Sequence, residues 1–110
     1  MSSDVVAGSG PLFQVQVQQM DGETLVIASG ELDLATTGQL RSCLMELRGG
    51  DQLIRLDMTA VEFMDSSGLH TLIRATEAFA ADGSRFKIVP SDPVRRVLEL
   101  VNLQERLPVE

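Results

Sequence analysis

The sequence is poor in several residue types on which common protein functions depend. Its 110 residues include no tryptophan, no tyrosine, one histidine and one cysteine. The lone Cys43 has no partner for a disulfide within the chain, and a lone histidine offers too few ligands for a zinc site. No apolar run approaches the roughly 18 residues of a membrane-spanning helix. A disulfide-stapled scaffold, a metal site of this kind and a helical membrane protein are therefore not expected.

Positive charge is also scarce. The chain has 9 Lys and Arg against 16 Asp and Glu, for a net charge of -7. A nucleic-acid binder needs a basic stripe for phosphate contacts, so no direct nucleic-acid partner is expected. Residues 1–8 show no positive segment followed by an apolar core, which argues against a signal peptide. We expect a cytoplasmic protein with no membrane insertion.

What is present fits one folded domain. The sequence is 44% hydrophobic and 23% charged, near the average for globular proteins, and its length suits a single core. Residues 1–11 are rich in Ser, Gly and Ala and end in Gly10-Pro11, which predicts a flexible leader. The folded domain is therefore predicted over residues 12–110.

An alternating pattern opens this domain. Over residues 13–18, apolar residues alternate with three glutamines, which is typical of a strand with one face in water. Asp21-Gly22 favours a tight hairpin turn, and residues 24–28 supply a second strand. The domain should thus begin with an antiparallel hairpin.

Three later segments show the spacing of amphipathic helices. The first has one apolar stripe, made of Leu40, Leu44 and Leu47. It ends at Gly49-Gly50, and either Thr36 or Thr37 could cap its start. Beside this stripe, Cys43 is expected to be a small buried hydrophobe.

Two further helices follow. One is predicted to begin near Ser66 or Ser67 and to stop at Asp82-Gly83. The other has a proline in its first turn and either Ser91 or Asp92 as its cap.

Strands over residues 53–58 and 86–89 separate these helices, and residues 106–110 could add a short edge strand. The resulting order is β-β-α-β-α-β-α. Right-handed crossovers make the second, third and fourth strands parallel, with the first strand antiparallel beside the second. The predicted fold class is α/β, a single domain with a mixed, mostly parallel sheet of four to five strands and packed helices.

Two polar segments fall at the carboxyl ends of neighbouring strands, where open α/β sheets tend to meet their ligands and partners. One is Gly30-Glu31-Leu32-Asp33, and the other runs from Phe63 to Gly68. If the two strands are neighbours, Asp33 lies near Ser66 and Ser67.

The stretch from Leu56 to Leu69 resembles the phosphorylatable segment of bacterial anti-sigma factor antagonists, members of the STAS domain family. Its Asp65-Ser66-Ser67-Gly68 string alone would be a weak signal, because short Ser/Gly strings are common in loops. Here an apolar strand precedes it, an apolar helix follows it, and Gly30-Glu31-Leu32-Asp33 matches the second hallmark of the family. The resemblance covers residues 13–109, including the order of elements.

The resemblance implies a phosphorylation switch. In the family, the serine directly before the glycine, here Ser67, is phosphorylated by a partner that is both a serine protein kinase and an anti-sigma factor. The unphosphorylated antagonist binds this partner and frees the sigma factor, and a phosphatase resets the phosphorylated form. The residues expected on the partner-binding surface are Glu31, Asp33, Asp65, Ser66, Gly68 and His70. Such a regulator is no enzyme and needs no cofactor.

Several simpler interpretations compete at these positions. Ser66 and Ser67 could serve only as helix caps, although a cap at Ser66 or Asp65 is also compatible with phosphorylation of Ser67. Asp33 could be a loop acid that helps the first helix to start. Asp57 and Asp65 suggest a magnesium site, but the sequence has no phosphate loop or lysine nearby. His70 could act as a general base toward Ser67, although no third member of a triad is evident.

Two alternative functions remain open. One is a STAS scaffold subunit, without phosphorylation, in a membrane transport or sensory complex; such relatives often alter the Asp-Ser-Ser-Gly string. The other is a flavodoxin-like enzyme or response-regulator receiver, which would need a lysine at a strand end, whereas Lys87 lies inside a predicted strand. Many relatives continue past the last strand into a final helix, whereas this chain stops at Glu110. Either that helix is dispensable here or another surface covers the sheet, which slightly favours self-association. We expect a monomer or a weak homodimer.

Overall fold

The chain forms a sheet of five strands and three helices within the residues that the computed structural model describes, 4–9 and 12–110. The strands are β1 (Asp4–Ser9), β2 (Phe13–Met20), β3 (Glu23–Leu32), β4 (Leu53–Met64) and β5 (Phe86–Pro90). The helices are α1 (Thr37–Glu46), α2 (Ser66–Ala81) and α3 (Asp92–Leu100).

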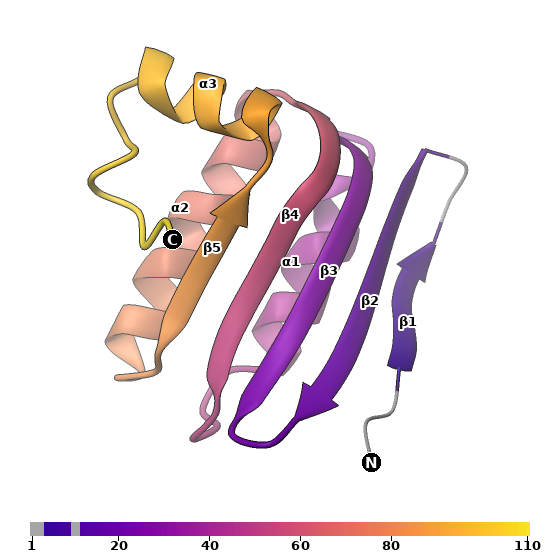
Figure 1. Cartoon of the computed structure of the whole chain (residues 1–110), viewed down its shortest axis with the longest axis vertical. Coiled ribbons are helices and arrows are strands. Elements are labelled where there is room, and N and C mark those ends of the chain that lie inside the picture. The colour runs from indigo at the N-terminus through magenta and orange to yellow at the C-terminus, as the bar shows by residue number, and fades with distance from the viewer. Residues whose placement is uncertain (1–3, 10–11) are drawn as a thin grey trace.

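The strands lie in the order β1-β2-β3-β4-β5 (Figure 1). β2 is antiparallel to both β1 and β3, whereas β3, β4 and β5 are mutually parallel. The predicted hairpin, the parallel core and the α/β fold class are therefore confirmed. Every parallel step passes through a helix, as crossover connections require.

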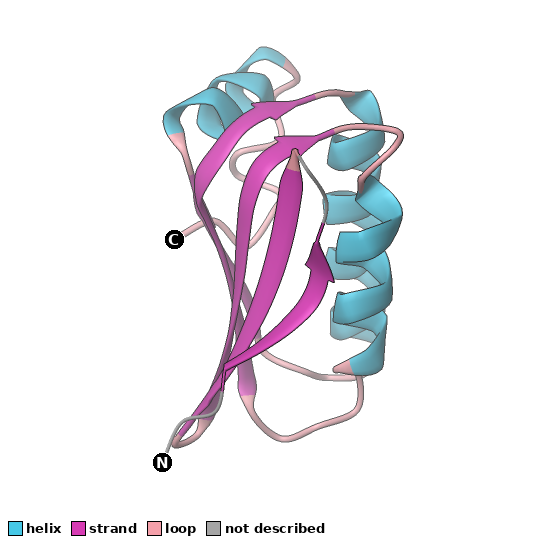
Figure 2. Cartoon of the chain, turned by 90° about the vertical axis from the view of Figure 1, so that its right-hand side faces the viewer, coloured by secondary structure: helices cyan, strands magenta, loops and turns pink. Residues whose placement is uncertain are grey.

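α1 and α2 lie side by side and cover one face of the sheet (Figures 1 and 2). The alternation in β2 explains this arrangement, because Phe13, Val15 and Val17 are buried toward the core while the intervening glutamines stay half-buried. At the far end of α2, the rings of Phe79 and Phe86 stack with their centroids 4.7 Å apart. α3 crosses the end of the sheet at which β5 finishes (Figure 1).

The leader predicted over residues 1–11 is wrong for residues 4–9, which form β1. The outer edge of β2 presents backbone N–H and C=O groups that need partners, and residues 4–9 pair with it in antiparallel register. The register shifts between Val6 and Gly8. The remainder of the predicted leader, residues 1–3 and 10–11, lies outside the described residues.

β4 is twice as long as the predicted strand and runs on to Met64. Its inward alternation breaks after Met58, and two register shifts against β3 absorb the irregularity. The pairing nevertheless continues until Leu32 lies opposite Met64. This extension carries the segment before α2 to the very end of β3.

The predicted edge strand at the C-terminus reduces to one parallel bridge between Val109 and Ile88. The Ile88 N–H donates to the Pro108 carbonyl at 2.9 Å, and the Glu110 N–H donates to the Ile88 carbonyl at 2.8 Å. Because proline has no N–H, Pro108 can contribute only its carbonyl to this edge. Arg55 then pairs with the Glu110 carboxylate at 2.7 Å and also with Glu23, which fixes the tail to β4 and β3.

Candidate functional site

The two polar segments meet at one rim of the sheet, as predicted from the parallel strand order. The Asp65 N–H donates to the Leu32 carbonyl at 3.2 Å, so the chain leaving β4 is bonded directly to the end of β3. We call the surface formed by residues 29–37 and 59–70 the rim. It is built from the last residues of β3 and β4, the loop before α1 and the first turn of α2.

α2 begins with a carboxylate cap. Asp65 has an extended backbone, with φ -101° and ψ -172°, and its Oδ1 accepts hydrogen bonds from the N–H groups of Ser67 at 2.8 Å and Gly68 at 3.2 Å. A cap of this kind satisfies backbone donors that the first turn of a helix leaves unpaired. The interpretation of Ser66 or Ser67 as the cap is therefore wrong, because Asp65 already fills that role.

Asp65 leaves both serine hydroxyls free. Ser66 is exposed and Ser67 is half-buried, and neither side chain hydrogen-bonds to any other part of the chain that the structure describes. The N-terminus of a helix favours a negative group, because its unpaired N–H groups and the helix dipole carry partial positive charge. The first turn of α2 thus combines an unengaged hydroxyl with a local field that stabilises an anion.

Gly68 lets this turn approach the sheet closely. A Cβ on Gly68 would lie 2.7 Å from Met64 Cγ and 2.9 Å from Leu32 Cγ. Both neighbouring side chains are buried, Leu32 completely. Glycine is therefore required here by packing, and its own surface is buried, which limits the part that Gly68 can play in a partner contact.

Gly30 has an analogous role in the other segment. Its φ is +100°, and a Cβ would lie 2.0 Å from the Leu12 carbonyl oxygen. Next to it, the Glu31 N–H donates to the same oxygen at 2.8 Å. Only glycine tolerates both the backbone angle and this approach, so Gly30 holds the start of β2 against the end of β3.

Asp33 organises the loop before α1. Its Oδ1 accepts from the N–H groups of Ala35 at 3.0 Å and Thr36 at 3.2 Å, and the Thr36 hydroxyl donates to the Glu31 carbonyl at 2.8 Å. Thr36 occupies the cap position of α1, as one of the two predicted choices, but its side chain makes no capping bond. The loop-acid interpretation of Asp33 describes these contacts, and among the described residues Asp33 makes no hydrogen bond to Ser66 or Ser67.

A pair of threonines joins the two segments, and no sequence pattern predicted this contact. The hydroxyls of Thr37, in α1, and Thr71, in α2, lie 2.5 Å apart. The Thr37 hydroxyl also lies 3.5 Å from the Ser67 carbonyl. Thr71 is buried, so this contact fixes the first turn of α1 against the turn that carries Ser67. No local pattern marks the pair, because the two residues meet only through the tertiary packing of α1 on α2.

The rim also exposes apolar side chains, which sequence patterns did not single out. Leu34 is 79% exposed and Phe63 is 48% exposed. Leu12, whose carbonyl accepts from the Glu31 N–H, is 57% exposed. Charge on the adjoining sequence is of one sign, since residues 29–40 hold two acids, residues 56–73 hold three, and neither stretch contains Lys or Arg. Exposed apolar groups amid acids are typical of a protein-binding surface.

The geometry does not support the magnesium-site interpretation of Asp57 or the general-base interpretation of His70. The Asp57 carboxylate accepts from the N–H and the hydroxyl of Thr59, at 2.9 and 2.6 Å, and so stabilises a local turn within β4. In the described part of the chain, no three His, Cys, Asp or Glu side chains gather as metal ligands would. His70 is exposed on α2, and within residues 4–9 and 12–110 no hydrogen bond joins it to Ser67.

Cys43 is buried among the core residues of α1, as predicted. Burial, and to a smaller degree the nearby Glu46 charge, raises the pKa of its thiol to about 11.

No helix in the described residues has the length and the apolar content to cross a membrane.

Comparison with known proteins places this geometry in context. The STAS domain family model matches residues 14–110. An anti-sigma factor antagonist from Mycobacterium paratuberculosis shares 28% identity, with 93% of this chain and 89% of that chain covered and a TM-score of 0.80.

Two more distant structures share the fold. The Bacillus cell fate determinant SpoIIAA in its phosphorylated form is 22% identical, with 87% of this chain and 88% of that chain covered and a TM-score of 0.67. The murine anion transporter Slc26a9 is 17% identical, with 99% of this chain but 20% of the transporter chain covered and a TM-score of 0.70. The same fold therefore occurs both in small regulators and as a part of a much larger membrane protein.

Proposed function

The chain belongs to the STAS domain family, and we propose that within it this protein is an anti-sigma factor antagonist controlled by phosphorylation of Ser67. In its unphosphorylated form it binds a serine protein kinase that is also an anti-sigma factor, and so releases the sigma factor. Phosphate on Ser67 abolishes this binding, and a phosphatase restores it. The protein is a substrate and a binding partner rather than an enzyme, and it acts in the cytoplasm in transcriptional stress responses.

One observation carries the proposal, namely the free hydroxyl of Ser67 at the start of α2. Asp65 caps the helix in its place, so phosphorylation of Ser67 removes no hydrogen bond that the described fold uses. A phosphate brings about -1.5 to -2 charges, and a helix N-terminus stabilises such an anion by roughly 0.3 to 2 kcal/mol. We therefore expect the phosphorylated domain to stay folded.

The same phosphate opposes partner binding. The partner in this proposal packs over the first turn of α2, which carries Ser67, and over the exposed Leu34 and Phe63 of the rim. It would then have to remove water from a dianion beside the Asp65 carboxylate, and like charges about 6 Å apart repel by a few kcal/mol at an effective dielectric constant near 20. Since each 1.4 kcal/mol is about tenfold in affinity, a loss of ~3 kcal/mol nearly abolishes a micromolar complex.

The proposal is tested with an anti-sigma factor serine kinase from the same genome. We expect incubation with that kinase and ATP to place phosphate on Ser67, as mapped by mass spectrometry, and Ser67→Ala to remove it. Ser66→Ala, which alters the neighbouring exposed hydroxyl, is the matched control and should still be phosphorylated. Ser67→Glu should lose kinase binding in isothermal titration calorimetry, whereas Ser66→Glu should lose less. Phosphate found only at another residue, or undiminished binding by Ser67→Glu, would contradict the proposal.

A STAS scaffold in a transport or sensory complex is the second candidate, because the transporter Slc26a9 contains the same fold. This function needs no modification of Ser67. It predicts that affinity capture from cell extract recovers a transporter or sensor subunit, and that Ser67→Ala and Ser67→Glu recover it equally well. Recovery of a serine kinase by Ser67→Ala but not by Ser67→Glu would favour the antagonist function instead.

A further inference from the structure

His70 lies on the exposed surface of α2, three residues after Ser67. Residues three apart on a helix are neighbours, with about 5–6 Å between their Cβ atoms. Helical side chains also lean toward the N-terminus, so the His70 side chain extends over the turn that carries Ser67. Within residues 4–9 and 12–110, neither the imidazole nor the Ser67 hydroxyl forms a hydrogen bond, so both are free to take a new partner.

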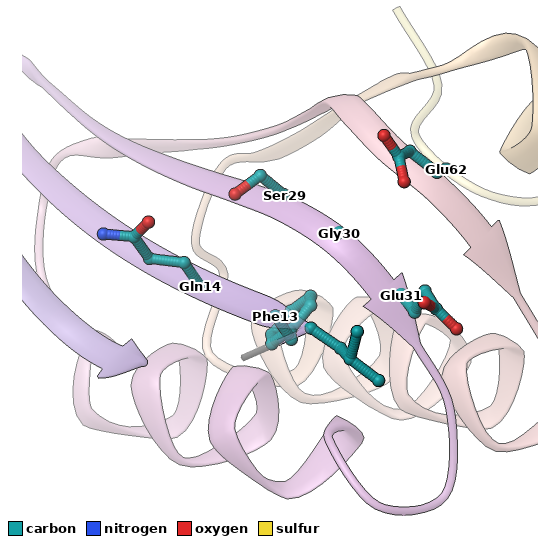
Figure 3. Close-up of a pocket in the computed structure, with 7 residues that line it drawn as sticks. Phe13, Gln14, Ser29, Gly30, Glu31 and Glu62 are labelled. Atoms are coloured by element: carbon teal, nitrogen blue, oxygen red, sulfur yellow. The ribbon is translucent and has the colours of Figure 1, made fainter. Parts of the chain in front are cut away.

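Positive charge is scarce around this turn. Residues 29–40 and 56–73 contain no Lys or Arg, so His70 is the only basic side chain in these two stretches. Figure 3 shows two charged side chains on the adjoining strand ends, Glu31 and Glu62, which point away from each other, and both are acids. Phosphate on the neighbouring serine would therefore enter an acidic surface in which the imidazole supplies the compensating charge.

We propose that His70 is the positioning residue for phosphate on Ser67, an inference that rests on the proposed function because it needs that serine to be phosphorylated. The protonated imidazole donates a hydrogen bond to a phosphate oxygen and holds the group against the first turn of α2. Both ring nitrogens of a protonated histidine are donors, and hydrogen bonds between charged partners are the stronger kind.

This pairing makes the charge of the phosphorylated rim depend on pH. A histidine changes charge between about pH 5 and 8, and a phosphoserine loses its second proton at about pH 6. Each charge favours the other, so the phosphate loses this proton at a lower pH when a protonated imidazole lies beside it.

Other charged groups border the same turn. They are Asp65 and Arg74 on α2, and Asp33 and Arg41 on α1 and the loop before it. Carboxylates and guanidinium groups keep their charge over the range in which a histidine titrates, so of these five groups only His70 changes its charge there. Arg74 is the competing donor, because it lies on the same helix one turn beyond His70.

The first experiment uses the full chain with phosphoserine installed in place of Ser67 by genetic code expansion, so it needs no kinase. Phosphorus NMR follows the phosphate as the pH is raised. We expect the midpoint of this titration to lie about 0.5 pH unit higher in His70→Gln than in the wild type. His70→Lys, which supplies a permanent positive charge, should keep the midpoint low. Lys87→Gln removes a positive charge of β5 that faces away from the core, and as the matched control it should leave the midpoint unchanged.

Two results of this titration would overturn the proposal. One is an equal midpoint in the wild type and in His70→Gln. The other is a larger rise in Arg74→Gln than in His70→Gln, since Arg74 would then be the main partner of the phosphate.

The second experiment separates this proposal from the proposed function. Binding of an anti-sigma factor serine kinase from the same genome is measured for the unmodified and the Ser67-phosphorylated protein. If phosphate abolishes binding but His70→Gln leaves the phosphorus titration unchanged, the pairing fails and the antagonist function stands. If the titration depends on His70 but the kinase binds neither form, the antagonist function fails and the pairing stands.

Discussion

Gly68 and Gly38 both lie in the first turn of a helix, yet we expect alanine to change stability in opposite directions at the two positions. In α2, a Cβ on Gly68 would meet Met64 Cγ at 2.7 Å and Leu32 Cγ at 2.9 Å. These atoms belong to buried side chains between the sheet and the helix, so neither can move into solvent. In α1, a Cβ on Gly38 would meet nothing within 4 Å.

The size of each effect follows from these contacts. Overfilling a packed interior costs typically 1–3 kcal/mol, and a helical Gly→Ala change returns at most about 1 kcal/mol through backbone entropy. Because both contacts of the added Cβ fall below 3.0 Å, the cost at Gly68 should lie in the upper part of that range, about 2–3 kcal/mol. After the gain of about 1 kcal/mol is subtracted, Gly68→Ala should lower the free energy of unfolding by roughly 1–2 kcal/mol. Gly38→Ala meets no clash and should raise it by about 0.4–1 kcal/mol.

Urea unfolding followed by far-ultraviolet circular dichroism measures both changes, and it suits a chain with no Trp or Tyr to report by fluorescence. The denaturation midpoints should move in opposite directions while the slope m stays constant. For a domain near this size, each kcal/mol corresponds to roughly 4–8 °C in melting temperature. A Gly68→Ala protein as stable as the wild type, or a destabilised Gly38→Ala protein, would refute the reasoning from close approach.

Two further predictions concern the tail and the core. Hydrogen bonds from Arg55 hold the pKa of the Glu110 carboxyl below its ordinary value. Their contribution to the stability of the fold is therefore present above the ordinary carboxyl pKa of ~4.3. It is lost as the pH falls through the lower pKa of the folded state. The difference in unfolding free energy between wild type and Arg55→Ala, measured by urea unfolding, should thus shrink in acid. A difference that stays constant with pH would contradict this prediction. Since burial raises the pKa of Cys43 to about 11, its thiol should react with Ellman's reagent far more slowly in folded than in urea-unfolded protein, and equal rates would contradict this.

The fold could be predicted because hydrophobic periodicity reports directly on secondary structure. The alternation of residues 13–18 holds in the structure, and Leu40 and Leu44 are buried on α1. Leu47 lies just beyond the end of α1 at Glu46 and is partly buried against the core. The two errors in the predicted fold occur where pairing between strands, rather than the hydrophobic pattern of one segment, determines the secondary structure. Residues 4–9 become a strand because the edge of β2 needs a partner, and β4 extends beyond Met58 because β3 continues beside it.

The candidate site was predicted only as far as its position. The parallel strand order brought the segments of Asp33 and Ser67 to one rim, but it could not show which side chain caps α2. Local sequence offers Asp65 and two serines as equally good caps, and backbone geometry selects Asp65. The Thr37–Thr71 contact depends on side chains from two separate helices, so no window of sequence contains it.

The structure divides the hallmark residues into two groups with different work. Gly30, Gly68, Asp33 and Asp65 are occupied in close approaches and backbone hydrogen bonds that build the rim itself. These four would serve a phosphorylated regulator and an unmodified scaffold equally well, because both need the same strand ends and helix start. The Ser67 hydroxyl contributes no hydrogen bond within the described chain. Whether this hydroxyl is phosphorylated therefore distinguishes the two proposed functions, whereas the surrounding motif identifies the family.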